Sequence, residues 1–339
     1  MEKQYKVSVI IPTYNRQDSV LRLLDSLGKQ SLDPGSFEVL VVDDGSSFEP
    51  ERLARRNFPF AFQLVRQENS GATRARNRGA EGSRGAVLVF IDDDVVVSER
   101  TLEALARACL ADEARTIAIG TLITCNENES SSFTRVAIAE EDRYQPNLDR
   151  QPVDREAHFT RCNTQLLAVR QDHFFELGML QDPTGGWPNW DDVDFGYRAY
   201  LAGFRLVQCG SAIGEHWDGS LATLDTASKR MFRASKSAVR LFQRYPGLQA
   251  YIPMYADKVP VNWRVDSPGL ILRKLLRRLL STWASISVME KVAAFLDKKN
   301  PSSPVLDKIY LWMIRGYMLQ GYRQGLREFG PVNGYKQAG

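Results

Sequence analysis

The chain has 339 residues and a formal net charge of +3, with 43% hydrophobic and 25% charged residues. These values are typical of a globular protein with a sizeable core, and they exclude a disordered chain, a collagen-like chain and a small disulfide scaffold. The longest apolar runs are short, as in Val87–Ile91, and none approaches the ~20 residues needed to span a bilayer.

The N-terminus lacks the pattern of a signal peptide, so we expect a cytoplasmic protein. The four cysteines are widely spaced and form no CxxC pair. We therefore expect reduced, mostly buried thiols in a reducing compartment.

Charge is unevenly distributed along the chain. Residues 1–224 contain 24 Lys and Arg against 34 Asp and Glu, whereas residues 225–339 contain 20 Lys and Arg against 7 Asp and Glu. An acidic front part suits a body whose carboxylates hold a metal, and a basic back part suits an anionic partner such as a membrane surface or a nucleic acid. A solvated basic surface is the alternative.

Strand and helix patterns alternate through the front part. Compact apolar runs predict strands at 7–12, 37–42, 62–65, 86–91 and 116–123. Helical periodicity predicts helices at 18–30, 49–56, 71–82 and 98–110, the first capped by Asp18 or Ser19. This alternation indicates an α/β fold with a mostly parallel sheet, and ligands of such sheets bind beyond the carboxyl ends of the strands.

Three adjacent carboxylates, Asp92, Asp93 and Asp94, directly follow a predicted buried strand. Like charges this close raise each other's pKa unless a cation neutralises them. An all-oxygen ligand set favours Mg²⁺ or Mn²⁺, with coordination positions left for water and phosphate oxygens. The alternative is a solvated acidic turn that caps a helix.

Three further features favour a nucleotide and metal site. Asp43 and Asp44 end an earlier strand, where a carboxylate can accept the imide N–H of a uracil. In the segment 68–79, Gly71 allows close backbone approach, and arginines such as Arg76 supply positive charge. His216 follows a predicted strand at 204–209 and can complete a metal shell as a neutral imidazole, although a lone His is more often structural.

Five motifs, in this order, resemble the family 2 inverting glycosyltransferases of the GT-A fold. They are SVIIPTYNR, VVDDGS, NSGATRARNRG, FIDDD and WDDVDFGYRAYLAGFRL, and they extend over about residues 7–217. The resemblance implies a Rossmann-like sheet, a nucleotide-sugar donor and a divalent metal. It also implies the following nucleotide-binding residues: Pro12, Thr13, Tyr14, Asn15, Asp43, Asp44, Asn69, Gly71, Arg76, Asp92 and Asp93.

By the same resemblance, Asp92 and Asp94 are the first and last carboxylates of a DxD motif. Asp94 corresponds to the direct metal ligand, and His216 matches a C-terminal metal-binding His of many members. The ion is expected to be Mn²⁺ or Mg²⁺.

Inverting transfer needs a base that deprotonates the acceptor hydroxyl. Asp191 and Asp192 open a predicted helix at 192–201, where backbone N–H groups and the helix dipole favour carboxylates. The family has Glu-Asp here, and its second position implies that Asp192 is the base and Asp191 a supporting group. Nearby aromatic residues are candidates for an acceptor platform or for core packing, namely Trp187, Trp190 and Trp217.

The alternation stops after about residue 224, so we predict a catalytic domain at 1–224 and a basic, mainly helical region at 225–339. Helices are expected at 227–245, 269–286 and 310–329, the last with a glycine spacing typical of close helix packing. In 269–286, leucines and Trp283 fall on one face and Arg and Lys on the other. This pattern suits an anionic membrane surface, and a helix docked with its basic face in solvent is the alternative.

The sequence thus predicts a metal-dependent inverting glycosyltransferase that uses a nucleotide sugar, expected to be a UDP-sugar. Its acceptor is expected to be a saccharide or lipid-linked saccharide in surface polysaccharide synthesis, at the inner face of the cell membrane. A sugar nucleotidyltransferase and a non-catalytic nucleotide-sugar-binding module remain alternatives, and nucleic acid is not expected as a partner. A dehydrogenase is disfavoured because GxGxxG is absent after the first strand.

Overall fold

The computed structural model describes residues 5–47, 53, 55–111, 115–126, 131–142, 153–184 and 190–332. The chain divides into two compact units. Unit 1 comprises residues 1–124, 144–182 and 191–217, and unit 2 comprises residues 125–143, 183–190 and 218–339. Unit 2 therefore takes two segments from the front part of the chain as well as the basic C-terminal region.

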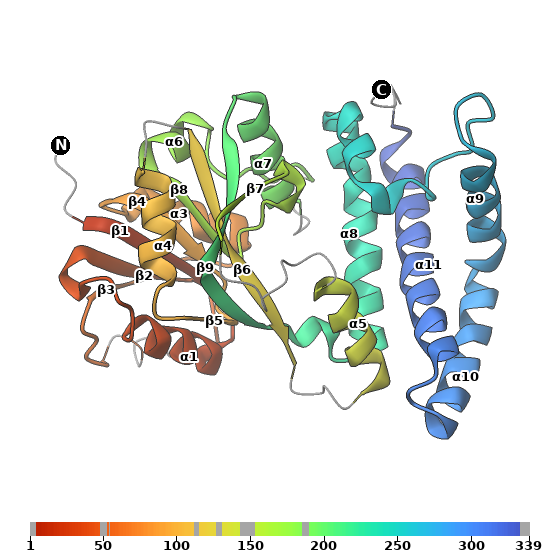
Figure 1. The fold of residues 1–339 in the computed structure, drawn as a ribbon, viewed down its shortest axis with the longest axis horizontal. Helices are drawn as coiled ribbons and strands as arrows, with labels where there is room; N and C mark the ends of the chain where they lie inside the picture. The colour runs from red at the N-terminus through yellow and green to blue at the C-terminus, as the bar shows by residue number, and fades with distance from the viewer. Residues whose placement is uncertain are drawn as a thin grey trace. The chain divides into compact units, whose positions relative to one another are not determined.

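Unit 1 is built on a sheet in which the described strands follow the order β3-β2-β1-β4-β8-β6-β9-β5, with β7 paired to β9 (Figure 1). The strands are β1 (Tyr5–Thr13), β2 (Phe37–Asp43), β3 (Ala61–Arg66), β4 (Gly85–Ile91), β5 (Val95–Val97), β6 (Thr116–Cys125), β7 (Arg155–Ala157), β8 (Leu166–Arg170) and β9 (Arg205–Trp217). The α/β fold predicted from the sequence is confirmed.

The four strands β3, β2, β1 and β4 are all parallel. Their carboxyl ends therefore lie at one edge of the sheet, where Thr13 of β1 pairs with Asp43 of β2. Beyond β4 the strand direction changes, since β8 is antiparallel to both β4 and β6, and β9 is antiparallel to β5 and β7. The parallel part is the one that carries the polar motifs.

Both faces of the parallel part are buried, as expected for strands covered by crossover helices. In β1, Val7, Val9 and Ile11 belong to one hydrophobic cluster, and Ile10 belongs to another. The described helices of unit 1 are α1 (Gln17–Leu27), α3 (Ala72–Gly82), α4 (Thr101–Leu110), α6 (Gln171–Glu176) and α7 (Asp191–Leu201). Of the helix predicted at 49–56, only Leu53, Arg55 and Arg56 are among the described residues.

The apolar stripe predicted for α1 is confirmed, because Val20, Leu23, Leu24 and Leu27 are all buried. The predicted cap at Asp18 or Ser19 is wrong. The helix begins one residue before Asp18, and its N-cap position is Arg16, whose side chain makes no capping hydrogen bond.

Unit 2 is helical. Its helices in the described residues are α5 (Ser132–Asp142), α8 (Leu224–Arg244), α9 (Pro268–Leu280), α10 (Trp283–Lys299) and α11 (Pro304–Phe329). An apolar cluster that includes Phe133, Ala227, Tyr310 and Met313 forms its core. The glycine spacing of α11 does serve close packing, because Gly321 and Gly325 lie against the backbone carbonyls of Phe232 and Lys236 on α8.

The single helix predicted at 269–286 is wrong. The chain forms two helices, α9 and α10, which meet at an angle of 81°. The break lies at Ser281 and Thr282, where the Thr282 side chain accepts a hydrogen bond from the Ser285 N–H and caps α10. A Thr at this position competes with helix continuation because its hydroxyl satisfies a backbone N–H of a new helix.

Among the described residues, no single helix has the length and hydropathy to cross a membrane. Only α9 and α10 taken together meet that length and composition test.

Candidate active site

The polar side chains of unit 1 gather where β1, β2 and β4 end. The Asp44 N–H donates to the Thr13 carbonyl oxygen at 2.9 Å, which joins the residues that follow β2 to the end of β1. The Thr13 hydroxyl in turn donates to Asp93 Oδ2 at 2.7 Å, which joins the end of β1 to the carboxylates after β4. The parallel register therefore brings together motifs that are up to 80 residues apart in the sequence.

Each of the three adjacent carboxylates has a different cationic or polar environment. Asp92 Oδ1 accepts from Arg76 Nη2 at 2.5 Å. Asp93 accepts from Thr13 and, at 3.2 Å, from Arg16 Nη1. Asp94 Oδ2 lies 2.5 Å from the same Arg16 nitrogen. Arg16 and Arg76 thus offset the repulsion that three adjacent carboxylates create.

The pKa values of these carboxyls diverge accordingly. Burial raises the pKa of Asp93 to about 6, although Arg16 and Thr13 oppose that shift. Burial also acts to raise the pKa of Asp94, but His216 and Arg16 outweigh it, so the pKa of Asp94 is lowered. Of Asp93 and Asp94, Asp94 is therefore the one that stays ionised over the wider pH range.

His216 is brought to Asp94 by the pairing of β5 with β9. Val95 stands opposite His216 in this antiparallel ladder, and the Trp217 N–H donates to the Asp94 carbonyl oxygen at 2.9 Å. His216 Nε2 lies 3.4 Å from Asp94 Oδ1, and the amide of Gln165 lies within 3.4 Å of both ring nitrogens. The imidazole is buried, so its position is fixed by packing as well as by these contacts.

Asp94 and His216 fit a divalent ion that is only partly held by protein. Asp94 Oδ1 is buried and has no hydrogen-bond partner, so it keeps a lone pair free for a cation. Its distance from the imidazole is close to the ~3 Å that separates neighbouring ligands of a small octahedral ion. In the part of the chain that the structure describes, no group of three or more His, Cys, Asp or Glu side chains converges on one point. Mg²⁺ is commonly held by one or two carboxylates, with the remaining ligands from water and phosphate.

Asp92 faces Arg76 and stands apart from this pair. Arg76 is 6% exposed, and its Nη1 lies 3.4 Å from Asp191 Oδ2, so one guanidinium joins the carboxylates of Asp92 and Asp191. The Thr73 hydroxyl also donates to Asp191 Oδ2, at 2.9 Å. These contacts tie the start of α7 to α3 and to the end of β4.

Asp192 lies at the N-terminal turn of α7, next to this link. Its Oδ1 accepts from the Val193 N–H at 2.7 Å. Burial, followed by the neighbouring charge of Asp191, raises the pKa of Asp192 to about 7. Asp194, which also lies in the first turn, is fully buried and its Oδ2 accepts from Arg198 Nε at 2.7 Å, so it supports the helix. The raised pKa of Asp192 is the kind of shift expected of a general base.

Asp44 uses both carboxylate oxygens to hold the loop before α3. Oδ1 accepts from the Ser70 N–H and Oδ2 from the Gly71 N–H, both at 2.8 Å. Asp43 is fully buried, with Oδ1 accepting from the Ser46 N–H and Oδ2 3.3 Å from Arg66 Nε. Gly71 has φ +90°, a conformation that favours glycine and that turns its N–H toward Asp44.

The remaining predicted nucleotide-binding residues surround this edge. Pro12 and Thr13 are buried at the end of β1, whereas Tyr14, Asn15 and Asn69 are exposed beyond the strands. The Asn15 side-chain oxygen accepts from the Ser47 N–H at 2.8 Å, and the Asn15 N–H donates to Ser46 Oγ at 2.8 Å. The loops after β1 and β2 are therefore joined, while the Tyr14 ring, 49% exposed, is free to stack.

The three tryptophans proposed as an acceptor platform have different environments. Trp187 lies outside the described residues. Within unit 2, the Trp190 indole N–H donates to the Ala234 carbonyl oxygen at 2.8 Å, and the ring packs near Tyr255. In unit 1, Trp217 is half-buried at the end of β9. Packing therefore accounts for Trp190.

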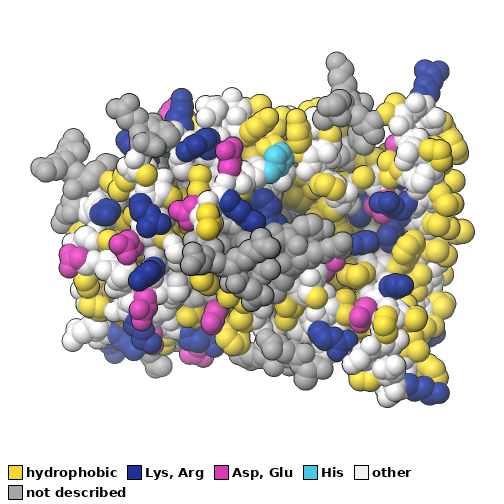
Figure 2. All heavy atoms as spheres, viewed as in Figure 1, with side chains coloured by type: hydrophobic (Ala, Val, Ile, Leu, Met, Phe, Trp, Pro, Cys, Tyr) yellow, Lys and Arg dark blue, Asp and Glu magenta, His cyan; other side chains and the backbone are white. Residues whose placement is uncertain are grey.

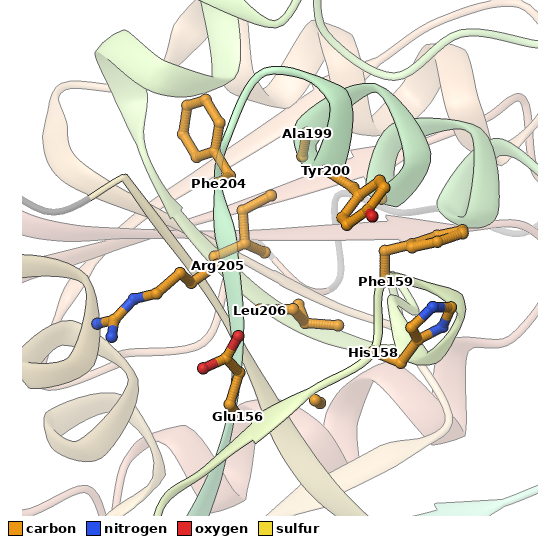
Figure 3. A pocket seen from close by; sticks show the side chains of 11 residues that line it. Glu156, His158, Phe159, Ala199, Tyr200, Phe204, Arg205 and Leu206 are labelled. Atoms are coloured by element: carbon orange, nitrogen blue, oxygen red, sulfur yellow. The ribbon is translucent and has the colours of Figure 1, made fainter.

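A separate pocket of about 280 Å³ lies beside α7, between β7, β9 and the short 3₁₀ helix Phe159–Arg161 (Figure 3). His158, Phe159 and Tyr200 form its aromatic side, and Glu156 and Arg205 lie along the other side. It contains none of the predicted site residues. Burial lowers the pKa of His158, so this imidazole is neutral at physiological pH.

Three residues of the site had no role in the sequence prediction: Arg16, Thr73 and Gln165. Arg16 stands three residues after Thr13, and its position shortly after a predicted strand could have indicated a role in the site. Thr73 and Gln165 gave no signal, because their partners are 118 and 51 residues away in the sequence.

Comparisons with known proteins agree with this fold. Residues 8–170 match the family model for glycosyl transferase family 2. Glycosyltransferase AglE of Haloferax volcanii is 29% identical over 242 residues, which cover 70% of this chain and 74% of AglE.

Two solved structures share the fold. That of Staphylococcus aureus TarS 1-349 in complex with UDP-GlcNAc has a TM-score of 0.50 and 18% identity, over 94% of this chain and 92% of that one. The structure of GalNAc-T7 with UDP, GalNAc and Mn²⁺ has a TM-score of 0.51 and 18% identity, over 90% of this chain and 59% of that one.

The fold shared with these structures and the family match over residues 8–170 indicate a glycosyltransferase of the GT-A type. Residues 8–170, just under half of the chain, are the part that matches glycosyl transferase family 2.

Proposed function

We propose that the protein transfers a sugar from a nucleotide sugar, most simply a UDP-sugar, to a hydroxyl group of a saccharide, with inversion at the anomeric carbon and with a divalent metal. One observation carries the proposal: Asp192, with its raised pKa, is adjacent to the Asp191–Arg76–Asp92 link that joins α7 to the carboxylates after β4. A base and a diphosphate site are the two parts that a single in-line displacement requires.

In this mechanism Asp192 accepts the proton of the acceptor hydroxyl. The acceptor oxygen then forms a bond to the anomeric carbon while the bond from that carbon to the phosphate oxygen breaks, and the nucleoside diphosphate departs. Asp191 is held by Thr73 and Arg76 and keeps the start of α7 in place. A pKa near 7 suits a base at physiological pH, because the group is largely ionised yet still basic.

Asp94 and His216 would hold the metal ion, either Mn²⁺ or Mg²⁺. When bound, the ion neutralises negative charge on the departing diphosphate. The uncoordinated, buried oxygen Asp94 Oδ1 and the imidazole 3.4 Å from it support this assignment. The Mn²⁺ named in the GalNAc-T7 structure supports the choice of metal, and the UDP-GlcNAc named in the TarS structure supports a UDP-sugar donor.

The base of the nucleotide is proposed to bind beside Asp43, Asp44 and the exposed Tyr14 ring. Asp44 is then a positioning residue, since it shapes the loop that ends at Gly71. The acceptor is proposed to be a lipid-linked saccharide in surface polysaccharide synthesis, with the enzyme in the cytoplasm at the inner face of the membrane. The excess of basic residues after residue 224 supports this location.

The test is hydrolysis of a panel of nucleotide sugars without acceptor, with and without Mn²⁺. We expect slow, metal-dependent release of one nucleoside diphosphate, lost in Asp94→Ala and retained in Asp25→Ala, which removes an exposed carboxylate of α1. Release of pyrophosphate from a sugar phosphate and a nucleoside triphosphate would instead identify a nucleotidyltransferase. If no donor turns over and UDP binding is independent of metal, the proposal is wrong and a binding module replaces it.

A further inference from the structure

Helix α9 is oriented with charged side chains inward. Lys274 and Arg277 are 0% and 2% exposed, which is unusual for these residue types. Lys274 Nζ lies 2.6 Å from Asp266 Oδ2 and donates to the Pro260 carbonyl oxygen at 3.1 Å. Arg277 Nε lies 3.2 Å from Asp257 Oδ2. Both cations are therefore paired within unit 2.

The inward position of Arg277 is reinforced by packing. Its guanidinium carbon lies 3.9 Å from the centre of the Trp312 ring, and its Nη1 donates to the Trp312 carbonyl oxygen at 3.2 Å. Asp257 also pairs with Lys258, whose Nζ lies 2.9 Å from Oδ1. Burial lowers the pKa of Arg277, and Asp257 counteracts this, so the pair holds the side chain in place as a cation. The orientation of α9 is thus fixed by specific contacts.

The opposite face of α9 exposes apolar side chains. Leu272, Leu275, Leu276, Leu279 and Leu280 are between 37% and 67% exposed. At 100° per residue these five fall on one stripe, and the exposed cations Arg273 and Arg278 fall on its two sides. This reverses the usual pattern, in which the apolar stripe of a surface helix faces the core.

Further apolar side chains are exposed on α10 and on the loop before α9. Trp283, Val288, Val292 and Phe295 are exposed on α10, and Trp263 of the preceding loop is 71% exposed. In Figure 2, hydrophobic side chains predominate along the right-hand edge, where Figure 1 shows α9 and α10. We call the exposed apolar residues of α9 and α10 the leucine face.

A contiguous apolar surface of this kind marks an interaction site. Exposing five leucines forgoes the free energy of burying them, while burying Lys274 and Arg277 costs desolvation that their partners only partly offset. If water were its only surroundings, α9 would be more stable with its leucines buried and its cations exposed. The arrangement is favourable when the leucine face meets another apolar medium.

The charges around the leucine face indicate which partner it contacts. The exposed ionisable residues of α9 and α10 are all basic: Arg273, Arg278, Lys291, Lys298 and Lys299. The two acidic residues of these helices, Glu290 and Asp297, are only partly exposed. A symmetric contact between two copies would place this cationic patch against itself, which is repulsive. An anionic bilayer offers apolar chains for the leucines, phosphate groups for the cations and an interface that suits Trp side chains.

We propose that the leucine face is a membrane-docking surface, on which α9 and α10 lie in the interfacial layer of an anionic bilayer. The leucines enter the acyl region, and Arg273 and Arg278 remain at the level of the phosphates. The buried contacts of Lys274 and Arg277 hold α9 in the orientation that exposes the leucines. The surface is inferred from unit 2 alone, and only its role in reaching a lipid-linked acceptor rests on the proposed function.

The test is co-sedimentation of the full chain with vesicles of phosphatidylcholine plus phosphatidylglycerol, and with vesicles of phosphatidylcholine alone. We expect binding to the anionic vesicles at low salt. The variant Leu275→Ser/Leu279→Ser should lose binding on the order of tenfold or more. Leu201→Ser, which removes a 63% exposed leucine at the end of α7, is the matched control and should bind as the wild type.

A second pair of variants separates insertion from adsorption. Arg273→Gln/Arg278→Gln should lose the preference for anionic vesicles, and the remaining binding should resist salt. A blue shift of tryptophan emission on vesicle binding should shrink in Trp283→Phe. Circular dichroism and thermal melting check that each variant is folded.

Three outcomes would overturn the proposal. They are failure of the wild type to sediment with anionic vesicles at low salt, wild-type binding by the leucine variant, and a dimer in solution that the leucine variant dissociates without any vesicle binding. Donor hydrolysis without acceptor is measured on the same samples. Since it needs no vesicle, its failure would contradict the proposed function and leave the docking surface standing.

Discussion

Arg16 forms an ion pair with Asp94, with its Nη1 2.5 Å from Oδ2, on the side of the carboxylate opposite the contact with His216. The Arg16 side chain is 53% exposed, whereas that of Asp94 is 12% exposed. A half-exposed, solvated cation therefore neutralises a carboxylate that the proposed metal ion also needs. The two cations compete for Asp94.

Arg16→Ala is therefore expected to bind Mn²⁺ more tightly in the absence of nucleotide. An exposed pair contributes about 1 kcal/mol, which corresponds to about a fivefold change in dissociation constant. Titration followed by the electron paramagnetic resonance signal of free Mn²⁺ measures it. Arg16→Lys should lie between the two, because a lysine keeps the charge without the planar fork. Weaker Mn²⁺ binding in Arg16→Ala would show that Arg16 supports the metal site.

The parallel half of the site was predictable because it depends on local patterns. Apolar runs predict where each strand ends. Parallel pairing then requires Thr13, Asp43 and the carboxylates after β4 to lie at one edge of the sheet. The contact of Asp94 with His216 depends on the antiparallel pairing of β5 with β9. For this contact the sequence offered only the chemistry of a lone imidazole and the family resemblance. That Asp44 uses both oxygens to hold a loop follows from backbone geometry that no spacing encodes.

The orientation of α9 was less accessible. The helical periodicity correctly placed the leucines and the cations of α9 on different sides, but it could not predict which side faces the rest of unit 2. That choice depends on Asp257 and Asp266, which lie in an irregular segment and pair with Arg277 and Lys274. The alternative of a solvated basic face is wrong for these two residues, since both are buried. The helix break at Ser281 was missed because the apolar spacing continues across it to Trp283 and Ile286.

Asp192→Asn is expected to abolish transfer while donor binding is kept. An amide cannot accept the acceptor proton, so kcat should fall by about 10² to 10⁴, and the UDP dissociation constant should change by less than about twofold. Steady-state kinetics and UDP titration give the two numbers. Transfer at near wild-type rate would remove Asp192 as the base.

The pH dependence of transfer should follow the same carboxyl. Burial and Asp191 raise the pKa of Asp192 to about 7, and the base acts as the carboxylate. Hence kcat/KM should rise as pH increases through about 7 and then level off, and the rise should be absent from the residual activity of Asp192→Asn. A profile that is flat from about pH 5 to about pH 8 would contradict this assignment, because a carboxyl with a pKa of about 7 changes its charge within that interval.

Arg76 is expected to be important for stability as well as for the site. Arg76→Ala leaves Asp92 and Asp191 without the cation they share, and breaking a buried pair by removing one partner costs about 3–5 kcal/mol. Urea unfolding should report this loss, with Arg76→Lys less affected. Arg78→Ala is the matched control, because Arg78 is exposed on the same helix. Equal midpoints for Arg76→Ala and Arg78→Ala would mean that the link carries no net stability.

The packing of α8 on α11 predicts the effect of one added methyl group. A Cβ at Gly321 would overlap the Phe232 carbonyl oxygen and lie 2.9 Å from its carbon, so the two helix backbones must move apart. Such overpacking typically costs about 1–3 kcal/mol. Gly269→Ala is the control: nothing lies within 4 Å of its added Cβ, and it stands in the first turn of α9.

Replacing a helical glycine by alanine is ordinarily stabilising by up to about 1 kcal/mol. The two substitutions are therefore expected to shift the melting temperature in opposite directions, downward for Gly321→Ala and upward for Gly269→Ala. Differential scanning calorimetry measures both shifts. If Gly321→Ala melts at or above the wild-type temperature, α8 and α11 are farther apart in solution than this packing requires, and the glycine spacing of α11 then has no role in the core of unit 2.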